Sequence, residues 1–234
     1  MSESETIVYG GGGNLVGLYG NANRYLSACH ARAKRVIVLP HTVRENESLL
    51  LLFGESGIIF CRELESFAHV RAVNPKLICY MGHDMALGLP VAQILTRSKS
   101  LGYKLRDTLN IRSMKRLIRF EQYAFRSKGD FSSLNAFRGD IEGCGRDSVA
   151  CNADLSQILS ENNMSEEACR ETAYAVVKFL SFFEHVRTDR LHIYIAGALL
   201  GRRVEVFDNS YGKNPSVYRY SLSGRFSNVR LIEN

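Results

Sequence analysis

In the first ninety residues, short apolar runs alternate with stretches in which apolar residues recur every three or four positions. The short runs predict buried strands, and the spacing of three to four predicts helices. The predicted strands are residues 6–9, 36–39, 57–61 and 77–81. The predicted helices are residues 15–29, 47–53 and 64–73. Strands and helices that alternate at such short intervals are typical of a parallel sheet in an α/β protein.

This periodic pattern is lost after residue 90 and resumes at residue 134. Ser165 followed by Glu166 predicts a helix start, because a hydroxyl can accept a hydrogen bond from the first turn and an acidic side chain suits its positive end. A second, strongly apolar helix is predicted to begin at Arg190. The other predicted elements are strands at residues 134–137, 204–207 and 229–232 and a short helix at 217–222.

We therefore expect an α/β protein with two Rossmann-like lobes, residues 1–96 and 131–234, joined by a basic connecting segment at residues 97–130. That segment holds ten Lys or Arg and three Asp or Glu, whereas the formal net charge of the whole chain is only +6. It fits a solvated helical face or a patch attracted to anionic lipids. A nucleic-acid surface is disfavoured, because the segment has no zinc-ligand spacing and no recognition motif.

The composition is that of an ordinary globular chain, with 45% hydrophobic and 23% charged residues. No apolar run approaches the roughly 20 residues that span a bilayer. The first residues lack the basic and apolar regions of a secretory signal. The six cysteines form no CxxC pair and no metal-ligand spacing. We therefore expect a cytoplasmic protein that binds no metal and no nucleic acid.

Four glycines at residues 10–13 follow the first predicted strand, and Asn14 is placed to cap the helix predicted after them. Glycines let the backbone approach a ligand, and a helix start favours negative charge. The spacing does not fit a dinucleotide fingerprint, and no Walker lysine follows. A ligand-binding loop at Gly12, Gly13 and Asn14 and a simple tight turn both stay open.

Polar side chains follow two further predicted strands, at the carboxyl ends where α/β proteins bind ligands. Asp84 follows residues 77–81 and could orient a sugar hydroxyl or cap a helix. Arg138 and Asp140 follow residues 134–137. An arginine flanked by carboxylates is either held for an anionic ligand or simply ion-paired, and the spacing does not separate the two.

Arg190 and His192 form the strongest pair in the sequence, at the start of the apolar helix. Arginine binds carboxylates or phosphates with two hydrogen bonds, and histidine exchanges protons near neutral pH. Lys213, in a polar loop with Asn209, adds a point charge suited to phosphate. The alternative is an Arg190 paired with Asp189 and a His192 in the core. The pattern favours a site for an anionic substrate.

Together, seven motifs resemble those of the polysaccharide pyruvyl transferase family, the ketal-pyruvate transferases of exopolysaccharides. They occur in family order and cover most of the chain outside the basic segment and the ends. The motifs are GGGGNL (10–15), VIVLPHTV (36–43), IFCRELESF (59–67), HDMAL (83–87), FRGDIE (137–142), TDRLHIYIAGALLG (188–201) and DNSYGKN (208–214). The last two are the most specific.

The resemblance implies transfer of the enolpyruvyl group of phosphoenolpyruvate onto a sugar of an exopolysaccharide or its lipid-linked precursor. A pyruvate ketal forms and phosphate is released, with no cofactor. The resemblance also implies a fold like that of the GT-B glycosyltransferases. Only nine residues precede Gly10, so we expect an abbreviated N-terminal lobe. Lipid-linked acceptors would give residues 97–130 a role in peripheral contact with the inner membrane face.

The resemblance assigns roles to individual residues. Arg138 and Arg190 would hold the donor with Lys213 and Asn209, and His192 would be the general acid. The candidates for the acceptor or its loops are Gly12, Gly13, Asn14, Asp84 and Asp140. Two alternatives stay open: a GT-B glycosyltransferase that uses a nucleotide sugar, and a non-catalytic subunit related to the pyruvyl transferases.

Overall fold

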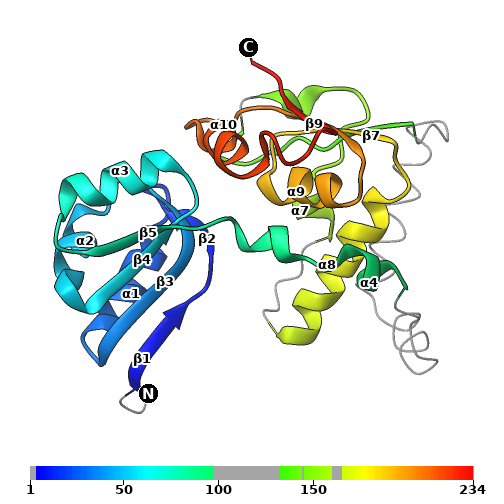
Figure 1. The fold of residues 1–234 in the computed structure, drawn as a ribbon. Helices are drawn as coiled ribbons and strands as arrows, with labels where there is room; N and C mark the ends of the chain where they lie inside the picture. The colour runs from blue at the N-terminus through cyan, green and yellow to red at the C-terminus, as the bar shows by residue number, and fades with distance from the viewer. Residues whose placement is uncertain (1–3, 97–131, 144, 160–164, 234) are drawn as a thin grey trace. The chain divides into compact units, whose positions relative to one another are not determined.

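The computed structural model describes residues 4–96, 132–143, 145–159 and 165–233 (Figure 1). These residues group into two units, which we call unit 1 (within residues 1–87 and 216–225) and unit 2 (within 88–215 and 226–234). Each contains a parallel sheet with helices between its strands, so the predicted α/β class with Rossmann-like parallel sheets is confirmed. The predicted basic connecting segment, 97–130, lies outside the described residues.

In the described residues, unit 1 has a five-stranded parallel sheet in which β1, β3, β4 and β5 lie in that order and β2 also pairs with β3. Its strands are β1 (Ser4–Tyr9), β2 (Gly12–Leu15), β3 (Ala33–Val43), β4 (Gly57–Cys61) and β5 (Ile78–Met81). Its helices are α1 (Gly20–His30), α2 (Glu47–Phe53) and α3 (Leu64–Val73), followed in the chain by a 3-10 turn at Met85–Gly88. Another 3-10 turn, Gly54–Ser56, leads into β4.

The prediction of a helix directly after the glycine run, capped by Asn14, is wrong. Gly12–Leu15 forms β2, whose residues pair with the last part of β3, and α1 begins only at Gly20. The reason is the length of β3, which has 11 residues and continues through Pro40 to Val43. Backbone groups on this part of β3 need hydrogen-bond partners, and the extended glycine run supplies them.

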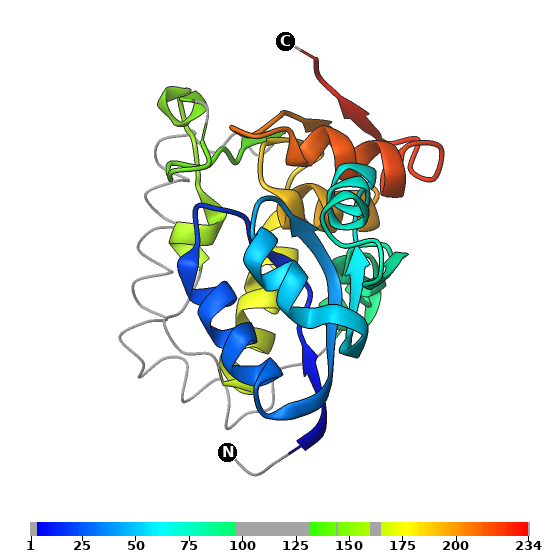
Figure 2. The ribbon, with the colours of Figure 1, turned by 90° about the vertical axis from the view of Figure 1, so that its left-hand side faces the viewer.

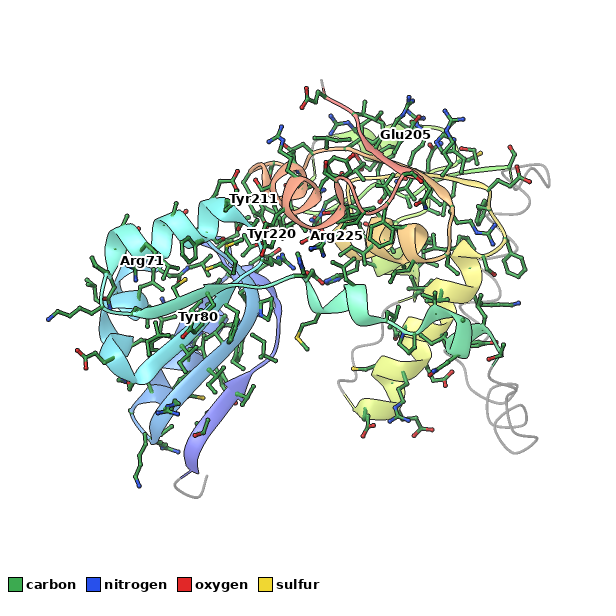
Figure 3. The ribbon with its side chains drawn as sticks, in the orientation of Figure 1. Arg71, Tyr80, Glu205, Tyr211, Tyr220 and Arg225 are labelled. Carbon is green, nitrogen blue, oxygen red and sulfur yellow. The ribbon has the colours of Figure 1, made fainter. Side chains whose placement is uncertain are left out.

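The strands of unit 1 follow chain order across the sheet, so right-handed crossovers place the helices on one face. Burying a large apolar side chain there stabilises the fold by about 1.5–3 kcal/mol. The buried core includes Leu26, Val36, Val38, Leu50, Phe53, Ile59, Val70 and Leu77. Val8 and Tyr80, on the edge strands β1 and β5, are 58% and 54% exposed. Tyr80 is labelled in Figure 3.

Residues 216–225 return from unit 2 and complete unit 1. They include a π-helical turn, Tyr218–Leu222. Nδ1 of His83 lies 3.1 Å from the buried hydroxyl of Ser221, and its ring packs on Tyr220 with centroids 4.9 Å apart (Figure 3). The segment is therefore attached to unit 1 by contacts at the carboxyl end of β5.

Unit 2 has a four-stranded parallel sheet in its described residues, in the order β6, β7, β8, β9. Figure 2 shows the orange and red C-terminal part of the chain, which includes α10 and β9, in a view turned by 90°. Its strands are β6 (Ser133–Asn135), β7 (His185–Thr188), β8 (Arg203–Val206) and β9 (Val229–Leu231). Its helices are α4 (Val91–Thr96), α7 (Leu155–Leu159), α8 (Glu166–Leu180) and α9 (Leu191–Leu199), and α10 (Lys213–Val217) spans the return to unit 1. A 3-10 turn at Arg146–Ser148 precedes α7.

The predicted start of α8 is confirmed, because the Ser165 hydroxyl accepts a hydrogen bond from N of Ala168. The apolar α9 begins after Arg190, as predicted. In the ranges that the structure describes, no helix is both long and apolar enough to cross a lipid bilayer.

Candidate functional site

The loops after β6, β7 and β8 lie at one edge of the unit 2 sheet, because neighbouring parallel strands end on the same side. They bring together the four residues predicted to bind the donor: Arg138 after β6, Arg190 after β7, and Asn209 and Lys213 after β8. All four belong to one hydrogen-bonded group of side chains, which we call the arginine network. Its other members are Asp140, Glu142, Asp154 and Tyr211.

Arg138 is buried and fully engaged by carboxylates. Its Nε and Nη2 donate to Oδ1 and Oδ2 of Asp140 at 2.7 and 3.0 Å, a two-point contact. Its Nη1 donates to Oε2 of Glu142 at 2.5 Å. The ion-pair interpretation of FRGDIE is therefore correct. It does not exclude a ligand, because the same guanidinium face suits an external carboxylate or phosphate.

Arg190 stands at the N-terminal cap of α9 and reaches two carboxylates from other loops. Its Nη2 donates to Oδ2 of Asp140 at 3.0 Å and to Oδ2 of Asp154 at 2.6 Å. The alternative pairing with Asp189 is wrong: Oδ1 of Asp189 instead accepts a hydrogen bond from N of Arg138 at 2.9 Å. Nε of Arg190 is buried and has no hydrogen-bond partner within the described ranges.

Glu142 is the centre of the network, although sequence reasoning did not single it out. Its buried Oε2 accepts hydrogen bonds from Arg138, from Nζ of Lys213 at 2.7 Å and from Oη of Tyr211 at 3.2 Å. Nδ2 of Asn209 lies 3.4 Å from the same oxygen. The FRGDIE motif could have indicated this role, because Glu142 follows Arg138 by four residues and can pair with it. Asp154, the other partner of Arg190, lies in no motif.

The buried carboxyl of Asp189 holds the backbone of the arginine network, because its Oδ1 accepts a hydrogen bond from N of Arg138. Burial raises the pKa of Asp189 to about 6, although the hydrogen bond from N of Arg138 and the charge of that arginine act in the opposite direction. The backbone oxygen of Asp189 accepts from Nδ2 of Asn214, which also donates to O of Phe207 at 2.9 Å. Asn214 therefore ties the loop after β8 to the loop after β7.

His192 lies in the first turn of α9, two residues after Arg190, and it is exposed. The alternative of a core histidine is therefore wrong. The helix fixes its backbone beside the arginine network, while its imidazole is accessible from solvent. His192 therefore stays a candidate for proton transfer.

The glycine-run candidates of unit 1 pack on a buried histidine. Oδ1 of Asn14 lies 2.8 Å from Nε2 of His41, and a Cβ atom added to Gly12 would lie 3.3 Å from the same nitrogen. Gly12 therefore permits a close backbone approach. Gly13 lies beside it in β2, so the tight-turn alternative is wrong for both residues. His41 was not predicted as part of this cluster.

Asp84 is buried and forms an ion pair. Its Oδ2 accepts from Nη1 of Arg62 at 2.7 Å, and its Oδ1 accepts from N of Ala86 at 2.9 Å. Nε of Arg62 donates to Oγ1 of Thr42 at 2.8 Å. The capping interpretation of Asp84 is thus correct for the turn that follows. Sequence reasoning missed Arg62, which lies inside the IFCRELESF motif.

The burial of His41 predicts a pH-dependent stability for unit 1. Burial, and then the charge of Arg62, lowers the pKa of His41 to about 4. The unfolded chain takes up a proton at about pH 6.5, so the stabilisation is fully present above pH 6.5 and is lost as the pH falls towards 4. The loss amounts to about 3 kcal/mol.

Urea unfolding between pH 4 and 7 should show that the free energy of unfolding of the wild type falls with pH, and that it falls less in His41→Gln. Equal slopes would contradict the assignment.

In the parts of the chain that the structure describes, no group of three or more His, Cys, Asp or Glu side chains is arranged to hold a metal ion. The arginine network contains three cations, Arg138, Arg190 and Lys213, each paired with a carboxylate of the network. The chemistry of the arginine network therefore suits a carboxylate or a phosphate.

Comparison with known proteins gives a partial relationship. No family model matches the sequence. The chain is 40% identical over 57 residues to "Putative pyruvyl transferase EpsO" of Bacillus subtilis (strain 168), a match that covers 24% of this chain and 17% of EpsO. The crystal structure of the uncharacterised protein KP1_0663 from Klebsiella pneumoniae subsp. pneumoniae NTUH-K2044 is similar along the whole chain, with a TM-score of 0.75 and 27% identity. The similarity covers 77% of that protein.

Proposed function

We propose that this chain belongs to the polysaccharide pyruvyl transferases and moves the enolpyruvyl group of phosphoenolpyruvate onto a sugar of an exopolysaccharide or its lipid-linked precursor. The observation that carries the proposal is the arginine network, in which Arg138, Arg190 and Lys213 come together from three loops. Phosphoenolpyruvate has a carboxylate and a phosphate, which match such a set of cations. The partial similarity to EpsO supports the same reaction class.

The reaction follows from these groups without a metal or cofactor. Arg138 and Arg190 hold the donor anion, with Lys213 and Asn209 at the phosphate. His192 gives its proton to the methylene carbon of phosphoenolpyruvate, and positive charge develops at C2. A sugar hydroxyl adds to C2, and its proton leaves with the departing phosphate. A second hydroxyl of the same sugar then closes the ketal, and its proton returns to His192. The fixed cations stabilise the phosphate as it departs.

Four of the residues proposed for the acceptor belong to unit 1. They are Gly12, Gly13 and Asn14, which lie in β2, and Asp84, which follows the carboxyl end of β5. The two units would correspond to the two lobes of a GT-B-like transferase, and both have the parallel sheets that such a fold requires. Asp140, another candidate for the acceptor, lies among the donor candidates of unit 2, where its carboxylate contacts both arginines.

The test is an assay of the purified chain with phosphoenolpyruvate and a galactoside or lipid-linked sugar. We expect phosphate release that depends on the acceptor, together with an acceptor that gains a carboxylate-bearing ketal. Arg190→Gln should abolish most of this release, because it removes a donor-binding cation. Release of a nucleoside diphosphate from a nucleotide sugar would instead indicate a glycosyltransferase. No turnover with either donor would indicate a non-catalytic subunit.

A further inference from the structure

Asp140 occupies the position in which both arginines would bind a ligand. Its Oδ1 and Oδ2 accept from Nε and Nη2 of Arg138 at 2.7 and 3.0 Å, and Oδ2 also accepts from Nη2 of Arg190 at 3.0 Å. A carboxylate gripped on two points by one guanidinium and shared with a second has the geometry of a bound anionic ligand. The side chain therefore imitates the anion that the site is proposed to bind.

Asp140 is also the carboxylate of the network that a solute can reach. Its side chain is 36% exposed, against 5% for Glu142 and 10% for Asp154. It lies at the start of a turn in which N of Gly143 donates to O of Asp140 at 2.8 Å. Oδ1 also accepts from N of Glu142 at 3.2 Å, which holds the side chain in its present orientation. Rotation of this one side chain would uncover the arginines without a change in the buried partners.

The charges of the network show why an anion must replace Asp140 rather than join it. The three cations, Arg138, Arg190 and Lys213, donate to three carboxylates, those of Asp140, Glu142 and Asp154. A further anion would meet cations that are already compensated. An anion that takes the place of Asp140 gains the contacts that Asp140 now makes with both arginines, and it reaches the side of Arg190 whose buried Nε has no hydrogen-bond partner in the described residues.

We propose that Asp140 is an internal competitor that occupies the two-arginine anion site in the empty protein and is displaced when a carboxylate or phosphate binds. The identity of that anion as phosphoenolpyruvate rests on the proposed function. Partial burial alone would raise the pKa of Asp140, but the hydrogen bond and charge of Arg138, together with Arg190, lower it to about 2. The competitor is therefore anionic throughout the neutral range. Its role is to set the affinity for the donor.

The test is calorimetric titration of the full chain with phosphoenolpyruvate and, separately, inorganic phosphate. We expect Asp140→Asn to bind both about tenfold more tightly, as it would if the side chain fills the site about nine-tenths of the time. Asp140→Glu keeps the charge and should stay near the wild-type affinity. Equal or weaker binding by Asp140→Asn would show that Asp140 positions the arginines, and would overturn the proposal.

The matched control is Asp147→Asn, which removes the same charge from the same region. Asp147 is exposed, and its Oδ2 would lie 3.6 Å from a Cβ atom on Gly139, the neighbour of Asp140. We expect its affinity to change less than about twofold, because screened surface charges contribute little. If Asp147→Asn raised the affinity for the anion as much as Asp140→Asn does, the effect would come from the net charge of the region. That result would overturn the proposal. Thermal melting of each variant identifies any that fails to fold. If one of the two Asp140 variants fails, the affinity of the other still tests the proposal.

The outcomes separate this inference from the proposed function. If phosphate binds more tightly to Asp140→Asn while phosphoenolpyruvate is never consumed, the competitor role stands and the proposed reaction fails. If the wild type transfers pyruvate but Asp140→Asn binds no more tightly, the reaction stands and the competitor role fails.

Discussion

Replacing Glu142 with alanine is expected to destabilise unit 2 by about 3–5 kcal/mol, the cost of removing one partner from a buried ion pair. The buried Oε2 of Glu142 accepts hydrogen bonds from both Arg138 and Lys213. Both cations are themselves buried, so the substitution leaves two positive charges without their shared partner. Such a loss is a large fraction of the stability of an ordinary domain.

Urea unfolding at pH 7 measures the effect as a lower transition midpoint. Glu142→Gln should lose less than Glu142→Ala, since the amide oxygen can still accept one hydrogen bond. Arg170→Gln breaks the exposed pair with Glu166 on α8 and serves as the control, with an expected change below about 1 kcal/mol. A Glu142→Ala protein with the wild-type midpoint would show that the two cations find other partners.

Replacing His192 with alanine is expected to lower the rate of pyruvyl transfer by about 10²–10⁴-fold, the usual contribution of a general acid. His192 follows Arg190 by two residues in the first turn of α9 and is exposed. Imidazole is the side chain best suited to give a proton to the donor near neutral pH. The arginines that hold the donor are unaffected, so the loss should fall on the rate rather than on binding.

The measurement pairs acceptor-dependent phosphate release at saturating phosphoenolpyruvate with calorimetric binding of the same donor. His192→Gln should behave like His192→Ala, because an amide keeps hydrogen bonds but does not transfer the proton. The matched control is His185→Gln on β7, whose histidine lies 3.6 Å from Glu205 and outside the arginine network (Figure 3). A loss of less than about tenfold for His192→Ala would remove it as the general acid.

The elements with strong local signals were predicted accurately from the sequence. The bounds of β4 and α3 agree with the predicted ranges 57–61 and 64–73. An apolar run after a glycine and a helix with an apolar stripe carry their signals in neighbouring residues. The strand β2 could not be predicted in this way. Its conformation depends on pairing with β3, which lies more than twenty positions along the chain. The local glycines and Asn14 instead predicted the start of a helix.

The sequence predicted the cations of the site, but it did not predict which carboxylates pair with them. Arg138, Arg190 and Lys213 each follow a strand, and parallel pairing brings such positions to one edge. The partners of Arg190 come from residues 140 and 154, and no spacing in the sequence indicates that the loop carrying Asp154 folds back to it. The same is true of the pair formed by Arg62 and Asp84.

The return of residues 216–225 to unit 1 has a genetic consequence. Neither unit is encoded by one continuous stretch of gene, because each is built from two separated segments of the chain. A gene fragment that ends anywhere between residues 88 and 215 encodes unit 1 without Ser221, the partner of His83. Recombination that exchanges one unit for a relative's version therefore needs three crossover points, near residues 87, 215 and 225, rather than one. The two halves of this fold are best inherited together.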